Sequence, residues 1–374
     1  MKPFMVVILL VLSGCSFDSP QSVDMNTNWA QDTQTLEQET MRRLAHLEGD
    51  SHRREVAQFV SVWERMRNGF ELCYDTNNRR ILHHLHRYAH QPHHVQELAT
   101  RAEPYLYLIS EAITARQMPM ELALLPMVES AFDPFAVSRE QAAGIWQLIP
   151  STAKSMGLQQ DWWYDGAKDL VASTEAALDY LYYLYQRFDN DWLLALAAYN
   201  SGEGTVARAI YKNKSAGRPA TFYDLQLPQE TRDYLPKLLA LVEIIKHPKR
   251  YQVSLPHVAD QPALKAVDIG TQIDLAFVAE LAGIDLRQVY RLNPGYPRWA
   301  THPDEYGPHH LLLPLSHAER FEVRVAKFDG TSWVNTTEYH VKPGDTLLKI
   351  AQKHQTSVTT LLAANKLKNS SQVQ

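Results

Sequence analysis

The chain has 374 residues, a formal net charge of −5 and only two cysteines. A chain longer than about 300 residues rarely keeps a single core, so we expect two or three domains. With 45% apolar and 21% charged residues, the composition is typical of a globular protein and excludes a disordered chain or a polytopic membrane protein. The slightly negative charge offers no basic field for phosphates, so we expect no nucleic-acid partner.

Residues 1–15 have the pattern of a secretory signal rather than of a folded domain. Their apolar run, Phe4 to Leu12, is too short to span a bilayer. Small residues lead directly into a cysteine in Ser13-Gly14-Cys15, which resembles the lipobox of bacterial lipoproteins. The resemblance implies that Cys15 is lipidated and anchors the mature chain in a membrane. The serine at position 16 favours the outer membrane, with the protein facing the periplasm. The alternative is a plain secretory signal with an incidental cysteine.

Residues 16–50 are rich in Gln, Asp, Thr and Asn and are predicted to be a polar tether. If Cys15 carries lipid, Cys73 has no partner for an intramolecular disulfide, and two cysteines cannot form a structural zinc site. We therefore expect Cys73 to be a small buried apolar residue.

Residues 51–248 show helical periodicity and no convincing strand. We divide them into a helical N-terminal extension, 51–100, and a body, 101–248, that holds the candidate chemistry. Apolar residues recur at intervals of three and four along each candidate helix. The expected helices lie at 56–70, 97–117, 120–130, 176–188 and 192–199, and another begins at Pro150. Ser173 and Thr174 precede the helix at 176–188, and Asp191 is suited to cap the helix at 192–199.

After residue 248 the pattern changes to short strands and two similar modules, 262–316 and 338–374. When Val341 is placed on Ile269 without a gap, Leu347 falls on Leu275, and such self-similarity indicates a repeated module. The second copy carries Gly344-Asp345-Thr346 and resembles a LysM domain. That resemblance implies a βααβ fold that binds glycans containing N-acetylglucosamine. Because the copy reaches Gln374 before an expected last strand, we interpret it as incomplete.

The first copy has Thr271-Gln272-Ile273-Asp274 in place of the Gly-Asp-Thr turn. Whether this module binds sugar or only packs against the rest of the chain stays open. The expected fold is therefore mainly α, with a helical domain followed by small α+β modules.

Glu129 is the candidate catalytic residue. It follows the apolar residues Leu122, Leu124, Leu125 and Val128, so its carboxyl should be partly desolvated and its pKa raised. A carboxylic acid that is protonated near neutral pH can donate a proton to a glycosidic oxygen. An isolated glutamate is more often structural, so the surrounding motifs decide between the two roles.

Those motifs resemble the SLT family of lytic transglycosylases, which have a goose-lysozyme-like helical domain. The match covers about residues 95 to 215. It comprises Leu125-Pro126, Glu129-Ser130, Ser138, Gly144-Ile145-Trp146-Gln147, Thr152-Ala153 and Ala197-Ala198-Tyr199-Asn200-Ser201-Gly202. The resemblance implies cleavage of peptidoglycan strands between N-acetylmuramic acid and N-acetylglucosamine without water, leaving a 1,6-anhydro end.

The resemblance also assigns roles to individual residues. Glu129 would protonate the leaving oxygen and then act as base, while Tyr199 would hydrogen-bond to Glu129 and orient it. Asn200 and Gln147 would contact the substrate, and Ser138 would hold sugar or the cleft loop. The structural alternatives are a core phenol for Tyr199, a helix stop for Asn200, a cleft-edge amide for Gln147 and a cap for Ser138.

Ordinary glycosidases need a second carboxylate. The candidates are Asp133, Asp165, Asp169 and Glu203, and none of them has an apolar run like that before Glu129. In the family the acetamido group of the substrate takes this part, so the lack of an obvious partner fits. Lys168 stands where family members often have arginine, and we expect a lost bidentate contact rather than lost activity.

Six histidines lie close together, at positions 83, 84, 86, 90, 93 and 94. We interpret them as a solvated helical face, with no metal and no cofactor. Two other functions remain open. One is a hydrolytic muramidase on the same fold, and the other is a noncatalytic wall-binding lipoprotein.

Overall fold

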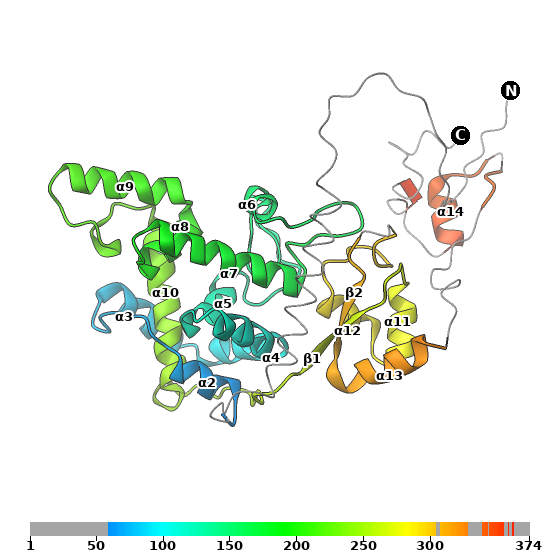
Figure 1. Ribbon diagram of the computed structural model, residues 1–374, viewed down its shortest axis with the longest axis horizontal. Helices are drawn as coiled ribbons and strands as arrows, with labels where there is room; N and C mark the ends of the chain where they lie inside the picture. Colours follow the sequence, from blue (N-terminus) through cyan, green and yellow to red (C-terminus); the bar gives the residue numbers. More distant parts are fainter. Residues whose placement is uncertain are drawn as a thin grey trace, which may run out of the picture. The chain divides into compact units, whose positions relative to one another are not determined.

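The computed structural model describes residues 59–303, 307–327, 339–342, 344–354, 358 and 361–362. The described residues up to 327 belong to one compact unit, and those from 339 onward belong to another. Figure 1 labels their helices and strands. The predicted signal, Cys15 and the tether lie outside the described residues, as do parts of the C-terminal module.

The first part of the larger unit is helical, and its elements follow in chain order. They are α2 (Val62–Asn68), α3 (Arg79–Ala89), α4 (Pro92–Ala115), η2 (Met120–Leu124), α5 (Leu125–Glu129), α6 (Pro150–Ser155), α7 (Leu170–Arg187), α8 (Trp192–Ser201), α9 (Glu203–Ser215), η3 (Phe222–Asp224), α10 (Gln229–Lys246) and η4 (Pro248–Tyr251). The named strands of the described chain all come later, so the mainly α prediction for this part is confirmed.

The N-terminal caps of α8 and α7 show how far the local sequence predicts where a helix begins. Asp191 accepts hydrogen bonds from the amides of Leu193 (2.8 Å) and Leu194 (3.1 Å), so the predicted cap of α8 is confirmed. The prediction for α7 is wrong, because this helix begins at Leu170 with Asp169 as its cap. The Asp169 carboxylate accepts two amide hydrogens one turn earlier than Ser173, which is buried inside the helix.

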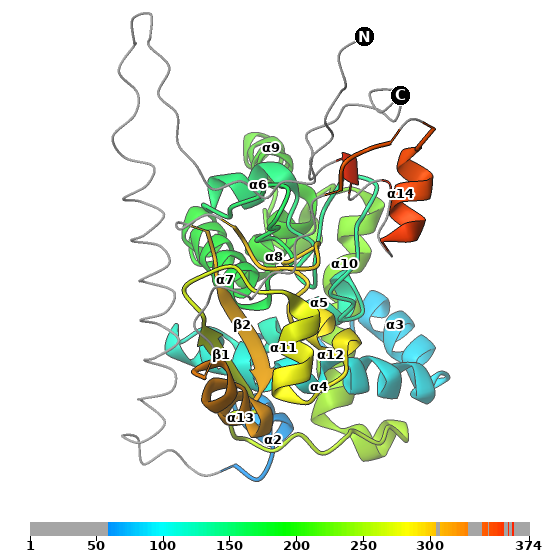
Figure 2. The same cartoon turned by 90° about the vertical axis from the view of Figure 1, so that its right-hand side faces the viewer.

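Helix α10 occupies the centre of the helical part. Twelve of its side chains are buried, and it packs against α3 and α8, as both views show (Figures 1 and 2). Because most of its side chains are buried, α10 is a core helix. The apolar cluster around it also takes in Leu292 and Leu312 from the module that follows, so the two parts share one core.

That module contains two strands, β1 (Leu264–Asp268) and β2 (His310–Pro314). They pair antiparallel, in a register that sets Leu264 opposite Pro314. Helices α11 (Leu275–Ala282) and α12 (Leu286–Leu292) lie between them in sequence, and α13 (Leu315–Val325) follows. The predicted βααβ order of the first module is therefore confirmed (Figure 2).

In the C-terminal unit the structure describes α14 (Leu347–Lys353). Leu347, Ile350 and Leu361 form its small apolar cluster. Asp345 accepts hydrogen bonds from the Tyr339 hydroxyl and the Lys342 amide, both at 2.8 Å. The Gly344-Asp345-Thr346 turn is thus formed, whereas the strands predicted for this module fall largely outside the described residues.

Cys73 is exposed, so its predicted burial is wrong. The preceding residue takes the buried place, because Leu72 points into the core. The amides of Glu71 and Leu72 both donate to the carboxylate of Glu121, which holds this stretch so that Cys73 faces solvent. In the part of the chain that the structure describes, no helix combines the length and apolarity needed to cross a bilayer.

Candidate active site

Glu129 is the last residue of α5, and the segment before it is buried from Met120 to Met127. The chain turns sharply after the helix, because Ala131 and Phe132 have φ angles of 54° and 56°. This left-handed conformation is unfavourable for residues with a Cβ atom. It is held by packing, since the Phe132 side chain is fully buried and stacks on Tyr105 with ring centroids 6.1 Å apart.

The carboxyl of Glu129 has one short hydrogen bond. The hydroxyl of Tyr234, on α10, donates to its Oε1 at 2.5 Å. Burial raises the pKa of Glu129 to about 7; the Tyr234 hydrogen bond works in the opposite direction, and the charge of Glu230 adds to the increase. Half-buried Glu129 is therefore about half protonated at neutral pH, as a general acid requires.

Tyr199 does not bond to Glu129, so that prediction is wrong. Its hydroxyl donates instead to the carbonyl of Trp146 at 2.7 Å. The ring still lies near the carboxylate, because burial and the charge of Glu129 raise the pKa of Tyr199 well above its usual value. Tyr234 takes the predicted orienting position.

Sequence reasoning missed Tyr234, although a signal existed. The residue precedes a stretch of α10, Leu235 to Ile245, in which every residue except Lys237 is buried. A buried phenol on such a helix needs a hydrogen-bond partner. The sequence does not say which acceptor meets it, because Glu129 lies 105 residues away along the chain.

The loop from Gly144 to Gln147 lies beside Glu129. The Ser130 hydroxyl donates to the carbonyl of Ile145 at 3.0 Å, which ties the residue after the acid to this loop. Gln147 has a φ of 50°, and its side-chain amide donates to the carbonyls of Gly144 (2.8 Å) and Ala136 (3.2 Å). The amide nitrogen of Gln147 thus shapes the loop, and this geometry favours its structural role.

The side chains of Ser138 and Asn200 differ in whether they are hydrogen-bonded within the protein. The Ser138 oxygen accepts from the amides of Glu140 (3.1 Å) and Ala142 (3.2 Å), which is the capping alternative. Asn200, half-buried at the end of α8 beside Tyr199, makes no side-chain hydrogen bond to any described residue. Of the four residues predicted to act beside Glu129, Asn200 is therefore the one whose side-chain amide has no hydrogen bond to another described residue.

The four acids considered as second carboxylates are engaged elsewhere. Asp133 accepts from the Phe135 amide, and Glu203 accepts from the Tyr183 hydroxyl at 2.9 Å. Lys168 pairs with Asp165 at 3.0 Å, and Asp169 caps α7. The acid whose charge acts on Glu129 is Glu230, which is exposed at the start of α10 and was not among the candidates.

The six histidines do not lie on one helix: His83, His84 and His86 lie on α3, His90 is its C-terminal cap, and His93 and His94 lie in the first turn of α4. His90 Nδ1 lies 2.8 Å from the carbonyl of His86, and most of these side chains are exposed. His84 differs from the predicted solvated face because it is buried, at 3.9 Å from Asp233. Burial lowers the pKa of His84, and the nearby Asp233 opposes this. Among the described residues, no group of three or more His, Cys, Asp or Glu could hold a metal.

Comparison with known proteins agrees with this geometry. Three family models match the chain: "Transglycosylase SLT domain" over residues 107–221, "Lytic transglycosylase MltD, LysM-like domain" over 263–329, and "LysM domain" over 339–374. The helical body is thus the SLT domain of a lytic transglycosylase.

Relatives narrow this class further. The chain is 42% identical over 304 residues to "Membrane-bound lytic murein transglycosylase D" of Escherichia coli, a match that covers 78% of this chain and 67% of the relative. The chain belongs to the family of membrane-bound lytic murein transglycosylase D. It is also 34% identical over 128 residues to "Soluble lytic murein transglycosylase" of Salmonella typhimurium, which covers 32% of this chain and 19% of that relative. Among solved structures, the 70 kDa soluble lytic transglycosylase of E. coli aligns with a TM-score of 0.31 and 26% identity, over 41% of this chain and 25% of the other.

Proposed function

We propose that this enzyme cleaves the β-1,4 bond between N-acetylmuramic acid and N-acetylglucosamine in peptidoglycan, with the muramic C6 hydroxyl in place of water. The observation that carries the proposal is Glu129: one half-buried carboxyl with a pKa of about 7. The four acids considered as its partner are bound to other groups. Glu230, whose charge acts on Glu129, is exposed at the start of α10. A site with a single acid of raised pKa suits a reaction in which the substrate supplies the nucleophile and stabilises the positive charge itself.

In the first step Glu129 donates its proton to the glycosidic oxygen, and the bond to the muramic C1 breaks. The departing sugar leaves with a new hydroxyl group. The muramic acetamido group stabilises the positive charge at C1. In the second step the carboxylate of Glu129 accepts the proton of the C6 hydroxyl while the C6 oxygen bonds to C1. The 1,6-anhydro ring closes and Glu129 regains its proton, so no water is consumed.

Other residues serve these steps in different ways. Tyr234 holds the carboxyl of Glu129 through its 2.5 Å hydrogen bond, which fixes the direction in which the proton is offered. The free amide of Asn200 is placed to contact a polar group of the sugar. Tyr199, Gln147 and Ser138 shape the loops on which the substrate lies.

Mass spectrometry of muropeptides released from purified sacculi tests this chemistry. The expected product ends in 1,6-anhydro-N-acetylmuramic acid, lighter by one water than a hydrolysed end. Reducing muramic ends as the main product would identify a hydrolytic muramidase. No release of muropeptides by wild-type protein would favour the noncatalytic wall-binding protein.

We further propose that Cys15 carries lipid and anchors the enzyme in the outer membrane, facing the periplasm. The support is Ser13-Gly14-Cys15 and the E. coli relative, whose name describes it as membrane-bound. Replacing Cys15 with Ala should move the protein to the soluble periplasmic fraction. A variant that still pellets with membranes after a carbonate wash would disprove the anchor.

For the C-terminal module, matched by the LysM model over residues 339–374, we propose glycan binding without a part in the chemistry. A chain ending at residue 328 should bind sacculi less well and still cleave soluble glycan strands. Loss of cleavage on soluble strands by a folded truncation would contradict this separation of roles.

A further inference from the structure

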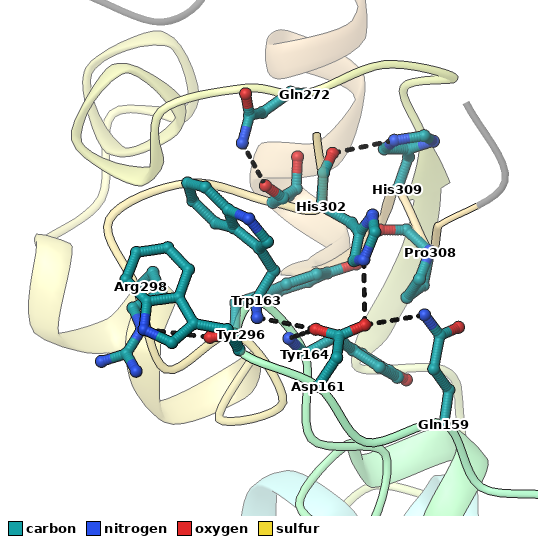
Figure 3. Close-up of polar contacts among 12 residues, drawn as sticks. Gln159, Asp161, Trp163, Tyr164, Gln272, Tyr296, Arg298, His302, Pro308 and His309 are labelled. Atoms are coloured by element: carbon teal, nitrogen blue, oxygen red, sulfur yellow. Dashed lines mark hydrogen bonds and ion pairs between the residues drawn. The ribbon is translucent and has the colours of Figure 1, made fainter. Parts of the chain in front are cut away.

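The first module, residues 263–329 of the LysM-like match, holds the helical body through a set of polar contacts. Figure 3 shows one of them, in which His302 points at the carboxylate of Asp161. His302 Nε2 lies 3.0 Å from Asp161 Oδ2. The same carboxylate accepts from the amides of Trp163 (2.7 Å) and Tyr164 (2.8 Å). One acid therefore shapes its own loop and binds the module.

A second pair repeats this arrangement deeper in the interface. His310 Nε2, at the start of β2, lies 3.0 Å from Asp169 Oδ2, and both side chains are buried. The other oxygen of Asp169 accepts from the amides of Val171 and Ala172 and so caps α7. A histidine of the module thus holds the carboxylate that starts a helix of the catalytic body.

Backbone contacts close the same interface. The amide of Asp165 donates to the carbonyl of Gly295 at 2.8 Å. A Cβ at Gly295 would lie 3.0 Å from Asp169 Cβ and 3.1 Å from the Tyr164 ring, so a larger residue would require these neighbours to shift. Arg298 donates to the carbonyl of Trp162 at 3.0 Å and lies 4.2 Å from the centre of its ring. Figure 3 shows that Arg298 and Tyr296 reach this loop from the module.

The segment held by the module is the one against which the active-site loop packs. A Cβ at Gly144 would lie 2.3 Å from the carbonyl oxygen of Ala167, so the two backbones are in direct contact. The indole of Trp146 donates to Thr174, on α7, at 2.9 Å. The carbonyl of Trp146 accepts from Tyr199, and that of Ile145 accepts from Ser130, the neighbour of Glu129.

The turn at residues 271–274 of the module makes its hydrogen bonds within the module. Asp274 caps α11 through the amide of Ala276 at 2.7 Å, and Gln272 donates to the carbonyl of Thr301 at 2.9 Å. Two polar side chains at the position of the missing Gly-Asp-Thr turn are therefore already satisfied within the module. This matches a module that has a structural task on this chain.

We propose that the LysM-like module is a built-in support of the active site, and that His310 is a positioning residue that sets the Gly144–Gln147 loop through Asp169. The chain of contacts runs from His310 to Asp169, from the 165–169 segment and α7 to Gly144 and Trp146, and from there to Tyr199 and Ser130. Close-packed contacts transmit a displacement because they leave no space to absorb it. The kinetic part of this inference rests on the proposed function.

The test uses the full chain and three histidine variants. His310→Ala removes the donor to Asp169, whereas His310→Gln places an amide N–H near the former ring nitrogen. His317→Ala is the matched control, because His317 lies in the same module but bonds to the carbonyl of Ala282 within it. Each variant is assayed on soluble glycan strands well below its unfolding midpoint, and amide hydrogen exchange is measured over residues 142–149.

His310→Ala should lower kcat at least about tenfold with little change in KM, because the acid and its loop are misplaced while binding groups remain. It should also speed exchange in the 142–149 segment. His310→Gln should restore most of both, and His317→Ala should change neither. Unchanged kcat and exchange in His310→Ala, or equal losses in His317→Ala, would overturn the proposal.

Two further outcomes, a variant that does not fold and a failure of the proposed function, can be told apart from a failure of this proposal. If His310→Ala does not fold, His302→Ala, which removes the contact to Asp161, carries the comparison by hydrogen exchange with His317→Ala as its control. Normal exchange over residues 142–149 in His302→Ala would then overturn the support proposed for the module. If the wild-type protein releases no anhydro products, the proposed function fails, while the exchange measurements still decide whether the module supports the loop.

Discussion

Half-buried Glu129 and buried Asp169 are two carboxyls of one helical body whose pKa values move in opposite directions. Burial raises the pKa of Glu129 to about 7, and its one hydrogen-bond donor, Tyr234, only partly opposes this. Burial would also raise the pKa of Asp169. The charge and hydrogen bond of His310, together with the amide of Ala172, outweigh it and lower the pKa. Burial alone therefore does not decide the charge of a carboxyl; the number and charge of its donors do.

The opposite pKa shifts of Asp169 and Glu129 correspond to two different roles. Asp169 caps the N-terminus of α7 and accepts hydrogen bonds from two backbone amides and from His310, so it is a stable anion with a structural role. Glu129 stands at the C-terminal end of its helix, where the backbone offers carbonyl groups instead of amides. The charged form of Glu129 is therefore poorly stabilised, and the group stays able to donate a proton near neutral pH.

The largest expected effect comes from Glu129→Gln. Glutamine keeps the shape and still accepts from Tyr234, but it has no proton to donate, a role usually worth about 10² to 10⁴ in rate. Muropeptide release should therefore disappear. Wild-type turnover in this variant would remove Glu129 from the mechanism.

The same variant tests the stability side of the comparison. The folded-state pKa of Glu129 lies above its ordinary value, so the stability due to its protonated form is complete below about pH 4.5 and is lost as pH rises through 7. Glu129→Gln should equal the wild type at pH 4 and exceed it by about 1–3 kcal/mol at pH 8. Denaturant unfolding at both pH values measures this difference, and a variant less stable at pH 8 would contradict it.

The next largest effect is expected for Asp169→Ala, this time on stability. The substitution removes a helix cap and leaves buried His310 without its partner, which together should cost about 3–5 kcal/mol. Asp191→Ala is the matched control, because Asp191 caps α8 without a histidine partner, and about 1 kcal/mol is expected. Since the pKa of Asp169 is lowered, its contribution is present above its ordinary pKa and is lost as pH falls below it. Equal losses in the two variants would show that His310 adds nothing.

Tyr234→Phe should alter the pH profile more than the rate. Without the phenol the pKa of Glu129 should rise further, because this hydrogen bond favours the charged form. Wild-type kcat should fall as pH rises through about 7, and in the variant this fall should occur at higher pH. The rate at the optimum should decrease by about tenfold or less. A profile that does not move would mean that the hydrogen bond does not act on the charged form.

Tyr199→Phe should have the smallest effect. It removes a hydrogen bond to the Trp146 carbonyl and none from Glu129, so a loss of about 1 kcal/mol in stability and a few-fold loss in rate are expected. The pH at which kcat falls should stay that of the wild type. A shift as large as that of Tyr234→Phe would mean that Tyr199 also bonds to the acid during catalysis.

The sequence by itself determined the features that depend on neighbouring residues. The mainly helical body follows from apolar periodicity, and the Asp191 cap follows from a polar residue before a helix. The βααβ order of the first module follows from the internal repeat together with the resemblance of its second copy to a LysM domain. The apolar run before Glu129 suggests a raised pKa, and the spaced motifs that resemble the SLT family make this glutamate the catalytic candidate. These signals act over one or two turns of chain, where spacing in sequence equals spacing in space.

Tertiary structure alone decided which distant groups meet. Tyr234 rather than Tyr199 reaches Glu129 because α10 crosses beside α5, and Asp169 rather than Ser173 starts α7 because His310 and two amides stabilise its charge there. Cys73 became exposed because the carboxylate of Glu121, 49 residues from Leu72, fixes that stretch. A hydrogen bond between residues far apart in sequence depends on the packing of whole helices, and no local pattern specifies that packing.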